Sequence, residues 1–201
     1  MIGALLGAIF FGSAAYVGVL LGMAAVNRTE RLPDAPPQAP APVWVLVGAC
    51  AVIGAIAATH AAQGQILLIA IVCVALVAIW ISDAHTGIVP DAFTLGPLGL
   101  ILFIGFWQHA WPLFISAAIP FVPFALTAAL SKGRGMGWGD VKLVALGGAV
   151  LGAQSAILAF ALACVAAVAL NYLRGRRSGA IAFAPYLAAA IGIGIPVGLL
   201  R

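Results

Sequence analysis

The sequence predicts an all-α polytopic membrane protein of about eight transmembrane helices, with both termini on the extracytoplasmic side. Of its 201 residues, 65% are hydrophobic and 7% are charged, whereas a water-soluble surface typically needs about a quarter charged residues. The apolar residues extend along the whole chain and are not confined to an N-terminal leader. The composition therefore excludes a soluble domain and predicts a single membrane-embedded domain over residues 1–201.

The first half of the chain contains three predicted spans, at residues 1–26, 43–59 and 66–82. Small residues at four-residue spacings, which let helices pack closely in lipid, recur in the first span at Gly3, Gly7, Gly18 and Gly22. Residues 27–42 combine charged side chains with a Pro/Ala-rich run. This segment predicts a short extended loop that is too small for a domain.

The second half contains predicted spans at residues 93–106, 113–130 and 180–200, and a longer apolar stretch between Lys142 and Asn171. Basic residues favour the cytoplasmic side of a membrane. If the basic residues on both flanks of the longer stretch share one side, an even number of crossings separates them. We therefore expect two short helices of about 13 residues each, hinged near Gly152, with eight of the nine basic residues facing the cytoplasm.

Two acidic stretches lie at span ends in this topology. Asp83 terminates the third span, and Asp140 follows a glycine-dense turn at the start of the sixth. We expect cytoplasmic loops at residues 83–93 and 131–140. Placing a carboxylate beside hydrocarbon costs free energy, so such a residue usually takes part in catalysis or lines a path for ions. Glycines let another backbone approach closely. The alternative is an entry loop whose Asp140 only caps the next helix.

Both aspartates fall on the same side at similar depth, so the two carboxyl groups can meet. Repulsion and desolvation in a partly dry site split the titration of such a pair, so that one member is ionised while the other keeps its proton. Aspartic proteolysis requires this state, because one carboxylate activates water and the other carboxyl group hydrogen-bonds the scissile carbonyl.

The motifs around these aspartates resemble those of the type IV prepilin peptidases, bacterial GxGD aspartyl proteases of the inner membrane. The first is D-x6-P-D at residues 83–91, followed by Thr94 and Leu95, and the second is M-G-x-G-D-x-K-L at residues 136–143. Residues 146–152 are similar to the glycine-rich continuation of the second motif. Residues 181–187 are similar to the I-P-F-G-P-[FY]-L element of the last span, with Ala182 and Ala184 in place of proline and glycine.

The resemblance implies that Asp83 and Asp140 are the catalytic pair of a multi-pass protease in the bacterial inner membrane. It implies loop or substrate-binding roles for four further residues, Gly137, Gly139, Pro90 and Pro185. Its expected partners are membrane lipid and prepilins or pseudopilins, with no nucleic acid and no cofactor. The short basic leader of the substrate would be cut on the cytoplasmic side, after a glycine and before a hydrophobic helix.

Bifunctional relatives carry paired C-x-x-C zinc ligands and an N-methyltransferase activity in the loop after the first span. Residues 27–42 hold that place here and contain no cysteine. We therefore expect cleavage without methylation.

Two other functions use the same aspartates. A small proton- or ion-coupled transporter would use Asp83 and Asp140 as ligands, but its acidic residues would lie near mid-span. A presenilin-like protease would place tyrosine before the first aspartate and carry a Pro-Ala-Leu element, whereas this chain has Ser82 before Asp83 and no such triplet.

The remaining polar residues favour structural roles. Asp91, next to Pro90, is expected to cap a helix, His85 to be solvated, and Lys142 to extend toward the headgroups. The cysteines are separated from one another in apolar runs, so no metal site or disulfide framework is expected; they are Cys50, Cys73 and Cys164.

Overall fold

The computed structural model describes residues 2–29, 41–131, 136–173 and 183–199. Within these ranges the chain forms eight α-helices and no strand. The helices are α1 (Ile2–Val26), α2 (Val43–His60), α3 (Gln63–Thr86), α4 (Asp91–Trp107), α5 (Trp111–Leu130), α6 (Trp138–Leu151), α7 (Ala153–Leu173) and α8 (Ala184–Leu199). The central part of the predicted 27–42 loop, the basic residues at 132–135 and 174–177, and the first two residues of the 181–187 motif lie outside the described residues.

Five of these helices, α1, α2, α3, α5 and α7, are long and apolar enough to cross a membrane. The apolar helices α4 and α8 are shorter, with 17 and 16 residues, and α6 has 14. The predicted hinge is confirmed, because Gly152 separates α6 from α7 with a φ of 79°. The expected length of about 13 residues for each of these helices was wrong for α7, which has 21 residues and continues to Leu173.

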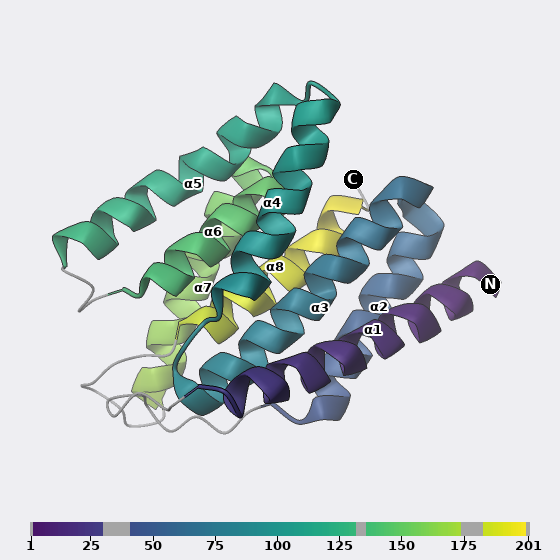
Figure 1. The fold of residues 1–201 in the computed structure, drawn as a ribbon, viewed down its shortest axis with the longest axis horizontal. Helices are drawn as coiled ribbons and strands as arrows, with labels where there is room; N and C mark the ends of the chain where they lie inside the picture. The colour runs from purple at the N-terminus through teal and green to yellow at the C-terminus, as the bar shows by residue number, and fades with distance from the viewer. Residues whose placement is uncertain (1, 30–40, 132–135, 174–182, 200–201) are drawn as a thin grey trace.

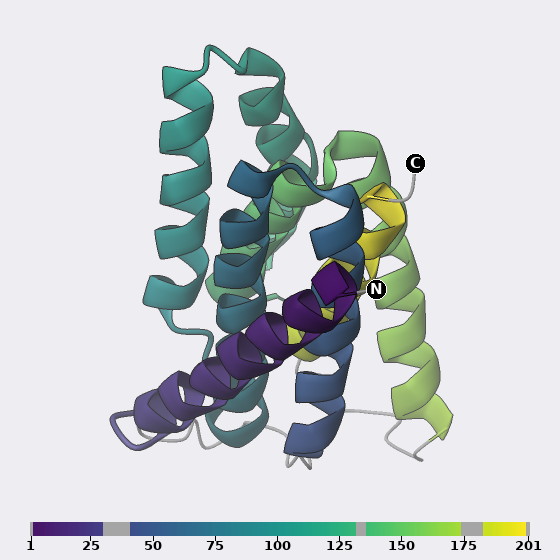
Figure 2. The same cartoon turned by 90° about the vertical axis from the view of Figure 1, so that its right-hand side faces the viewer.

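The helices run side by side, with the ends near the two aspartates gathered at one end of the bundle (Figures 1 and 2). The turns between α2 and α3, α4 and α5, and α6 and α7 lie at the opposite end. The start of α1 and the end of α8 are also at that opposite end. The helix ends that bear Asp83 and Asp140 therefore share one end of the bundle, as the predicted topology requires.

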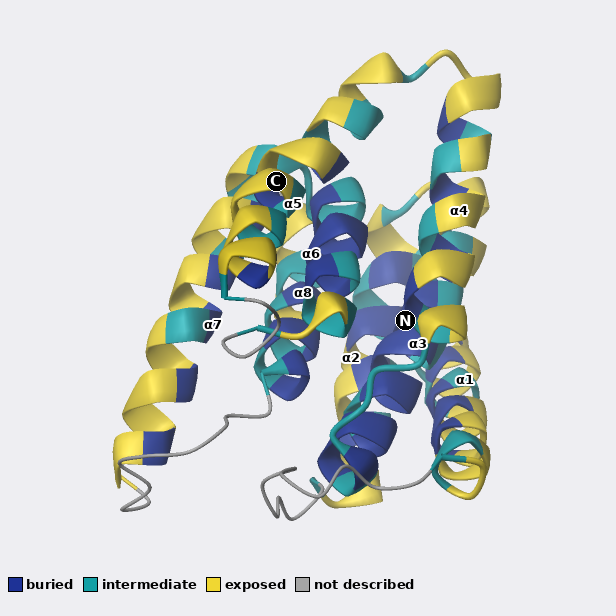
Figure 3. Ribbon diagram, turned by 60° about the vertical axis from the view of Figure 1, so that its left-hand side comes forward, coloured by how far each residue is buried: buried dark blue, intermediate teal, exposed yellow. Residues whose placement is uncertain are grey.

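The core is centred on α3 and α6, which are buried along much of their length (Figure 3). Half of the most apolar 18-residue window of α3 is buried, compared with 17% for α5. A Cβ atom on Gly147 would lie 2.5 Å from Phe160 of α7, and one on Gly148 would lie 2.5 Å from the Ser116 carbonyl oxygen of α5. The paired glycines therefore let α6 pack between α5 and α7.

The glycines of α1 act as the sequence predicts at three of four positions. A Cβ on Gly7 would overlap the Gly54 carbonyl oxygen of α2, and one on Gly18 would lie 2.6 Å from the Val74 carbonyl oxygen of α3. Gly22 likewise lies against Ile81 of α3. Gly3 differs, because no atom lies within 4 Å of the position its Cβ would take. Close packing of α1 therefore begins one turn further along than its first glycine.

Candidate active site

Asp83 lies inside α3, one turn before the helix ends. The helix terminates at Gly87, whose φ of 72° places it in the left-handed region, and the Gly87 amide donates to the Asp83 carbonyl oxygen. The Thr86 hydroxyl donates to the Ser82 carbonyl oxygen, and the Ser82 hydroxyl donates to the Ile88 carbonyl oxygen. These bonds hold the short connection after α3 against its last turn.

Asp140 lies in the first turn of α6. Gly137 is the N-cap residue of this helix, and the Asp140 amide donates to the Gly137 carbonyl oxygen. The Asp140 carboxylate lies beside the Gly137 backbone, because a Cβ atom on Gly137 would lie 3.5 Å from Asp140 Oδ2. The carboxylate therefore lies near the N-cap of α6, although no side-chain hydrogen bond caps this helix.

A single close contact joins the connection after α3 to the start of α6. A Cβ on Gly139 would lie 2.8 Å from the Cβ of Val89, a distance that real Cβ atoms do not adopt. Val89 belongs to the connection held against the end of α3, and Gly139 precedes Asp140. A glycine at position 139 therefore lets the start of α6 approach the connection that follows α3.

The two carboxyl groups interact electrostatically in this arrangement. Asp83 is only 6% exposed, and among the described residues its Oδ2 has no hydrogen-bond partner. Asp140 lies outside the five long apolar helices, and burial raises the pKa of its carboxyl group to about 6, although the nearby Gly137 backbone opposes the shift. Two interacting carboxyl groups that lose hydration in this way can hold one proton between them near neutral pH.

Asp91 and Lys142 form an ion pair across the same region, with 2.6 Å between Nζ and Oδ1. The capping role expected for Asp91 was wrong, because Pro90 is the N-cap residue of α4 and no side chain caps that helix. Lys142 does not simply extend toward headgroups, because its ammonium group has a carboxylate partner on α4. The pair joins the start of α4 to α6, two residues after Asp140.

The expected catalytic loops are shorter than predicted. Residues 83–86 belong to α3 and residues 91–93 to α4, so residues 87–90 form the first connection. In the second loop, Gly139 and Asp140 are already helical, because α6 begins at Trp138. Both aspartates therefore project from helix ends and not from loops, which limits the conformations that their backbones can adopt.

The other predicted site residues are divided between two places. Gly137 and Pro90 are the N-cap residues of α6 and α4, next to the aspartates. Pro185 is buried in the first turn of α8 and lines a groove together with Ala84, the residue after Asp83. His85 is half-buried. In the described ranges, no three side chains of His, Cys, Asp or Glu gather as possible metal ligands.

Sequence reasoning missed three contacts near the site. The Val89–Gly139 approach has no signal in the sequence, because valine is common in apolar segments. The Asp91–Lys142 pair could have been inferred from opposite charges in the two motifs. Asn171 is 5% exposed, and its Nδ2 donates to the Ala167 carbonyl oxygen and, at 3.4 Å, to the Tyr186 hydroxyl of α8.

The fold and the site define a class: an integral membrane protein with one buried and one half-buried carboxyl group, each close to the end of a helix. Residues 68–171, just over half of the chain, match the model of the type IV leader peptidase family. The chain belongs to this family, which implies a protease. No curated protein and no solved structure matches the chain. The matched segment includes both aspartates and the ion pair, whereas α1, α2 and α8 lie outside it.

Proposed function

We propose that this protein is an aspartic endopeptidase that removes the short basic leaders of type IV prepilins or pseudopilins, with Asp83 and Asp140 as its catalytic pair. The observation that supports this most directly is that the carboxyl groups of Asp83 and Asp140, both inside the segment that matches the family, lie near enough to interact electrostatically. The Oδ2 of Asp83 is buried and has no hydrogen-bond partner among the described residues, so none of those residues competes for the proton that the pair would share.

The proposed reaction uses the single proton that the pair holds. The ionised carboxylate removes a proton from water, whose oxygen attacks the scissile carbonyl carbon, while the protonated carboxyl group donates to the carbonyl oxygen as negative charge develops there. The tetrahedral intermediate collapses when a carboxyl group protonates the amide nitrogen and the C–N bond breaks. The Gly137 backbone favours the charged form of Asp140 and so favours this residue as the base.

The proposed location is the bacterial inner membrane, with the aspartate end of the bundle facing the cytoplasm. The exposed Arg28 follows α1 at this end, and Lys142 lies there in α6, in line with the rule that basic residues stay inside. Cysteines introduced at two exposed positions at opposite ends, Asn27 and Gln108, test the orientation. An impermeant thiol reagent added to intact cells should label the second and not the first, and labelling of Asn27→Cys would reverse the topology.

Replacement of either aspartate by asparagine tests the catalytic pair. The substrate is a tagged model prepilin with a basic leader, a glycine at the cut and an apolar helix. Asp83→Asn and Asp140→Asn should each reduce leader removal by at least about 10³-fold, because the remaining group cannot supply both proton transfers. The control is Asp91→Asn, which removes a nearby carboxylate outside the pair. Normal cleavage by either variant of the pair would exclude that residue from catalysis.

The protein is proposed not to methylate the new N-terminus. Residues 27–42 contain no cysteine or histidine, and a structural zinc site needs about four ligands, mostly cysteine and histidine. Purified protein should be incubated with the model prepilin and S-adenosylmethionine, and the product weighed by mass spectrometry. A mass gain of one methyl group on the new N-terminus would contradict the proposal.

A further inference from the structure

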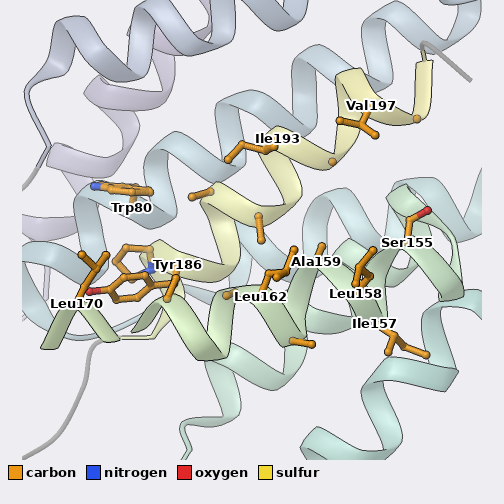
Figure 4. Close-up of a pocket in the computed structure, with 18 of the residues that line it drawn as sticks. Trp80, Ser155, Ile157, Leu158, Ala159, Leu162, Leu170, Tyr186, Ile193 and Val197 are labelled. Atoms are coloured by element: carbon orange, nitrogen blue, oxygen red, sulfur yellow. The ribbon is translucent and has the colours of Figure 1, made fainter. Parts of the chain in front are cut away.

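A groove of about 1010 Å³ lies between α7 and α8, and its lining does not include the residues of the ion pair or of the Val89–Gly139 contact. Figure 4 shows Trp80, Leu170 and Tyr186 at one end and Ser155 and Val197 at the other. Its lining includes no Asp, Glu, Lys or Arg among the described residues. Its occupant should therefore be apolar along most of its length.

One end of this groove reaches the proposed catalytic site. Trp80 and Ala84 of α3 line it, and Asp83 lies between them in the chain. Tyr186 lines the same end and receives the hydrogen bond from the buried Asn171 of α7, which ties α7 to α8 there. This end of the groove therefore lies one residue along α3 from Asp83, although Asp83 itself does not line it.

The groove is open along its side. Leu158 and Leu162 on α7 are 60% and 61% exposed, and Ile193 on α8 is 68% exposed, although all three line it. In a bilayer this exposed rim faces lipid, so a helix that is already in the membrane can enter sideways without passing through water.

Small residues form much of the lining on both helices. On α8 they include Ala190 and Gly198, and on α7 Ala163 and Ala166; Gly194 also lines the groove, but a Cβ atom there would meet Leu151 of α6. Small residues let another helix approach closely in lipid, where dispersion contacts drive association. An acyl chain is thinner and more adaptable than a helix and does not require such a surface.

The length of the groove suits a helix. From Gln154 to Leu170, the lining of α7 covers sixteen residue steps, or about 24 Å at 1.5 Å per residue. A second helix lying along it would place about sixteen residues in the groove. This is most of the length needed to cross the hydrocarbon core of a bilayer, about 30 Å.

We propose that the groove between α7 and α8 binds the apolar helix of the substrate and presents the peptide bond at its end to Asp83. This inference rests on the proposed function, because it takes the substrate to be a chain whose cut lies directly before a hydrophobic helix. The groove selects for that helix, whereas the aspartates act on the backbone before it.

A matched pair of alanines on α7 tests the groove. Ala166 and Ala169 are both exposed, but Ala166 lines the groove and Ala169 does not. A photo-crosslinking amino acid at each position, in an Asp140→Asn background that keeps the substrate uncut, should crosslink the model prepilin helix from position 166 and not from 169. With both aspartates intact, Ala166→Trp should lower kcat/KM at least about 10-fold, mainly through KM, and Ala169→Trp should leave it unchanged.

Each outcome supports or overturns the inference. If the wild-type protein cleaves the model prepilin, but positions 166 and 169 crosslink equally and their tryptophan variants are equally active, the groove does not bind the substrate helix. The proposed function would then stand. Crosslinks from position 166 only to lipid, or only to a second copy of the protein, would also overturn the groove inference. If the wild-type protein leaves the model prepilin uncut, the proposed function and the groove inference both fail.

Discussion

The contact of α1 with α2 and the contact of α6 with the connection after α3 both depend on glycine, but their surroundings differ. Between α1 and α2, Gly7 and Gly54 bring two apolar helices into backbone contact, with Phe11 buried beside them. At the other contact, Gly139 meets Val89 and brings two carboxyl groups together. The first contact stabilises the folded state. The second brings together two carboxyl groups that each lose hydration, which costs free energy. The same residue type can therefore serve stability in one region and chemistry in another.

Gly139→Ala should separate the two roles most clearly. The added Cβ would meet the Val89 Cβ at 2.8 Å, so the start of α6 must move, and a misplacement of about 1 Å can cost roughly 100-fold in rate. We expect about a 100-fold loss of kcat with little loss of thermal stability. The double variant Gly139→Ala with Val89→Gly removes the opposing Cβ and should recover most of the activity. Failure of this rescue would show that the Val89 contact is not what the glycine serves.

The stability of the aspartate end should depend on pH. Burial raises the pKa of Asp140 to about 6, so the folded state holds this proton more tightly than the unfolded state does. The stabilisation from the protonated form is complete below the ordinary pKa near 4 and is lost as the pH rises through 6. Asparagine does not ionise, so the Asp140→Asn variant keeps its stability as the pH rises. Its free energy of unfolding at pH 7 should therefore exceed that of the wild type by about 2–3 kcal/mol.

Melting curves in detergent between pH 4 and pH 7 provide the measurement for this prediction. The difference in Tm between Asp140→Asn and the wild-type protein should grow as the pH rises. A difference that stays constant across this range would mean that ionisation of Asp140 does not oppose folding.

Gly54→Ala tests the apolar contact between α1 and α2. The new Cβ would overlap the Gly7 carbonyl oxygen and lie 2.5 Å from Phe11, and such overpacking costs about 1–3 kcal/mol. Tm should fall, while the activity of the protein that remains folded should be unchanged. Gly48→Ala on the same helix is the matched control, because no atom lies within 4 Å of its new Cβ. Equal Tm values for the two variants would contradict the contact.

The smallest effect is expected at the Asp91–Lys142 pair. The two side chains are 61% and 28% exposed, and exposed pairs contribute about 0–1 kcal/mol. Lys142→Met should lower kcat/KM by about two- to fivefold, because the start of α4 loses its tie to α6. The charge swap Asp91→Lys with Lys142→Asp should restore part of the loss. A swap no better than either single variant would indicate that each residue acts separately.

Local properties of the chain were sufficient for much of the fold. Gly152 was predicted as the hinge because basic residues on both flanks of the apolar run require an even number of crossings, and glycine is where that run is interrupted; the structure confirms the break there. The start of the second span at Val43 was also predicted, because the proline-rich linker ends there. Both depend on residues adjacent in sequence. The length of α7 was not predicted, because charge placement decides how many crossings there are and not where each helix ends.

The sequence by itself determined the class of protein, since its hydrophobic content and its two aspartate motifs do not depend on any long-range contact. Only the tertiary structure decided what stands next to those aspartates. Val89 meets Gly139, Lys142 binds Asp91, and Ala84 opens into the groove between α7 and α8. Each of these pairings joins segments from different helices, and their partners are set by how α3, α4, α6 and α8 pack. Contacts of this kind do not repeat at a fixed spacing along the chain, so residue spacing and composition cannot predict them.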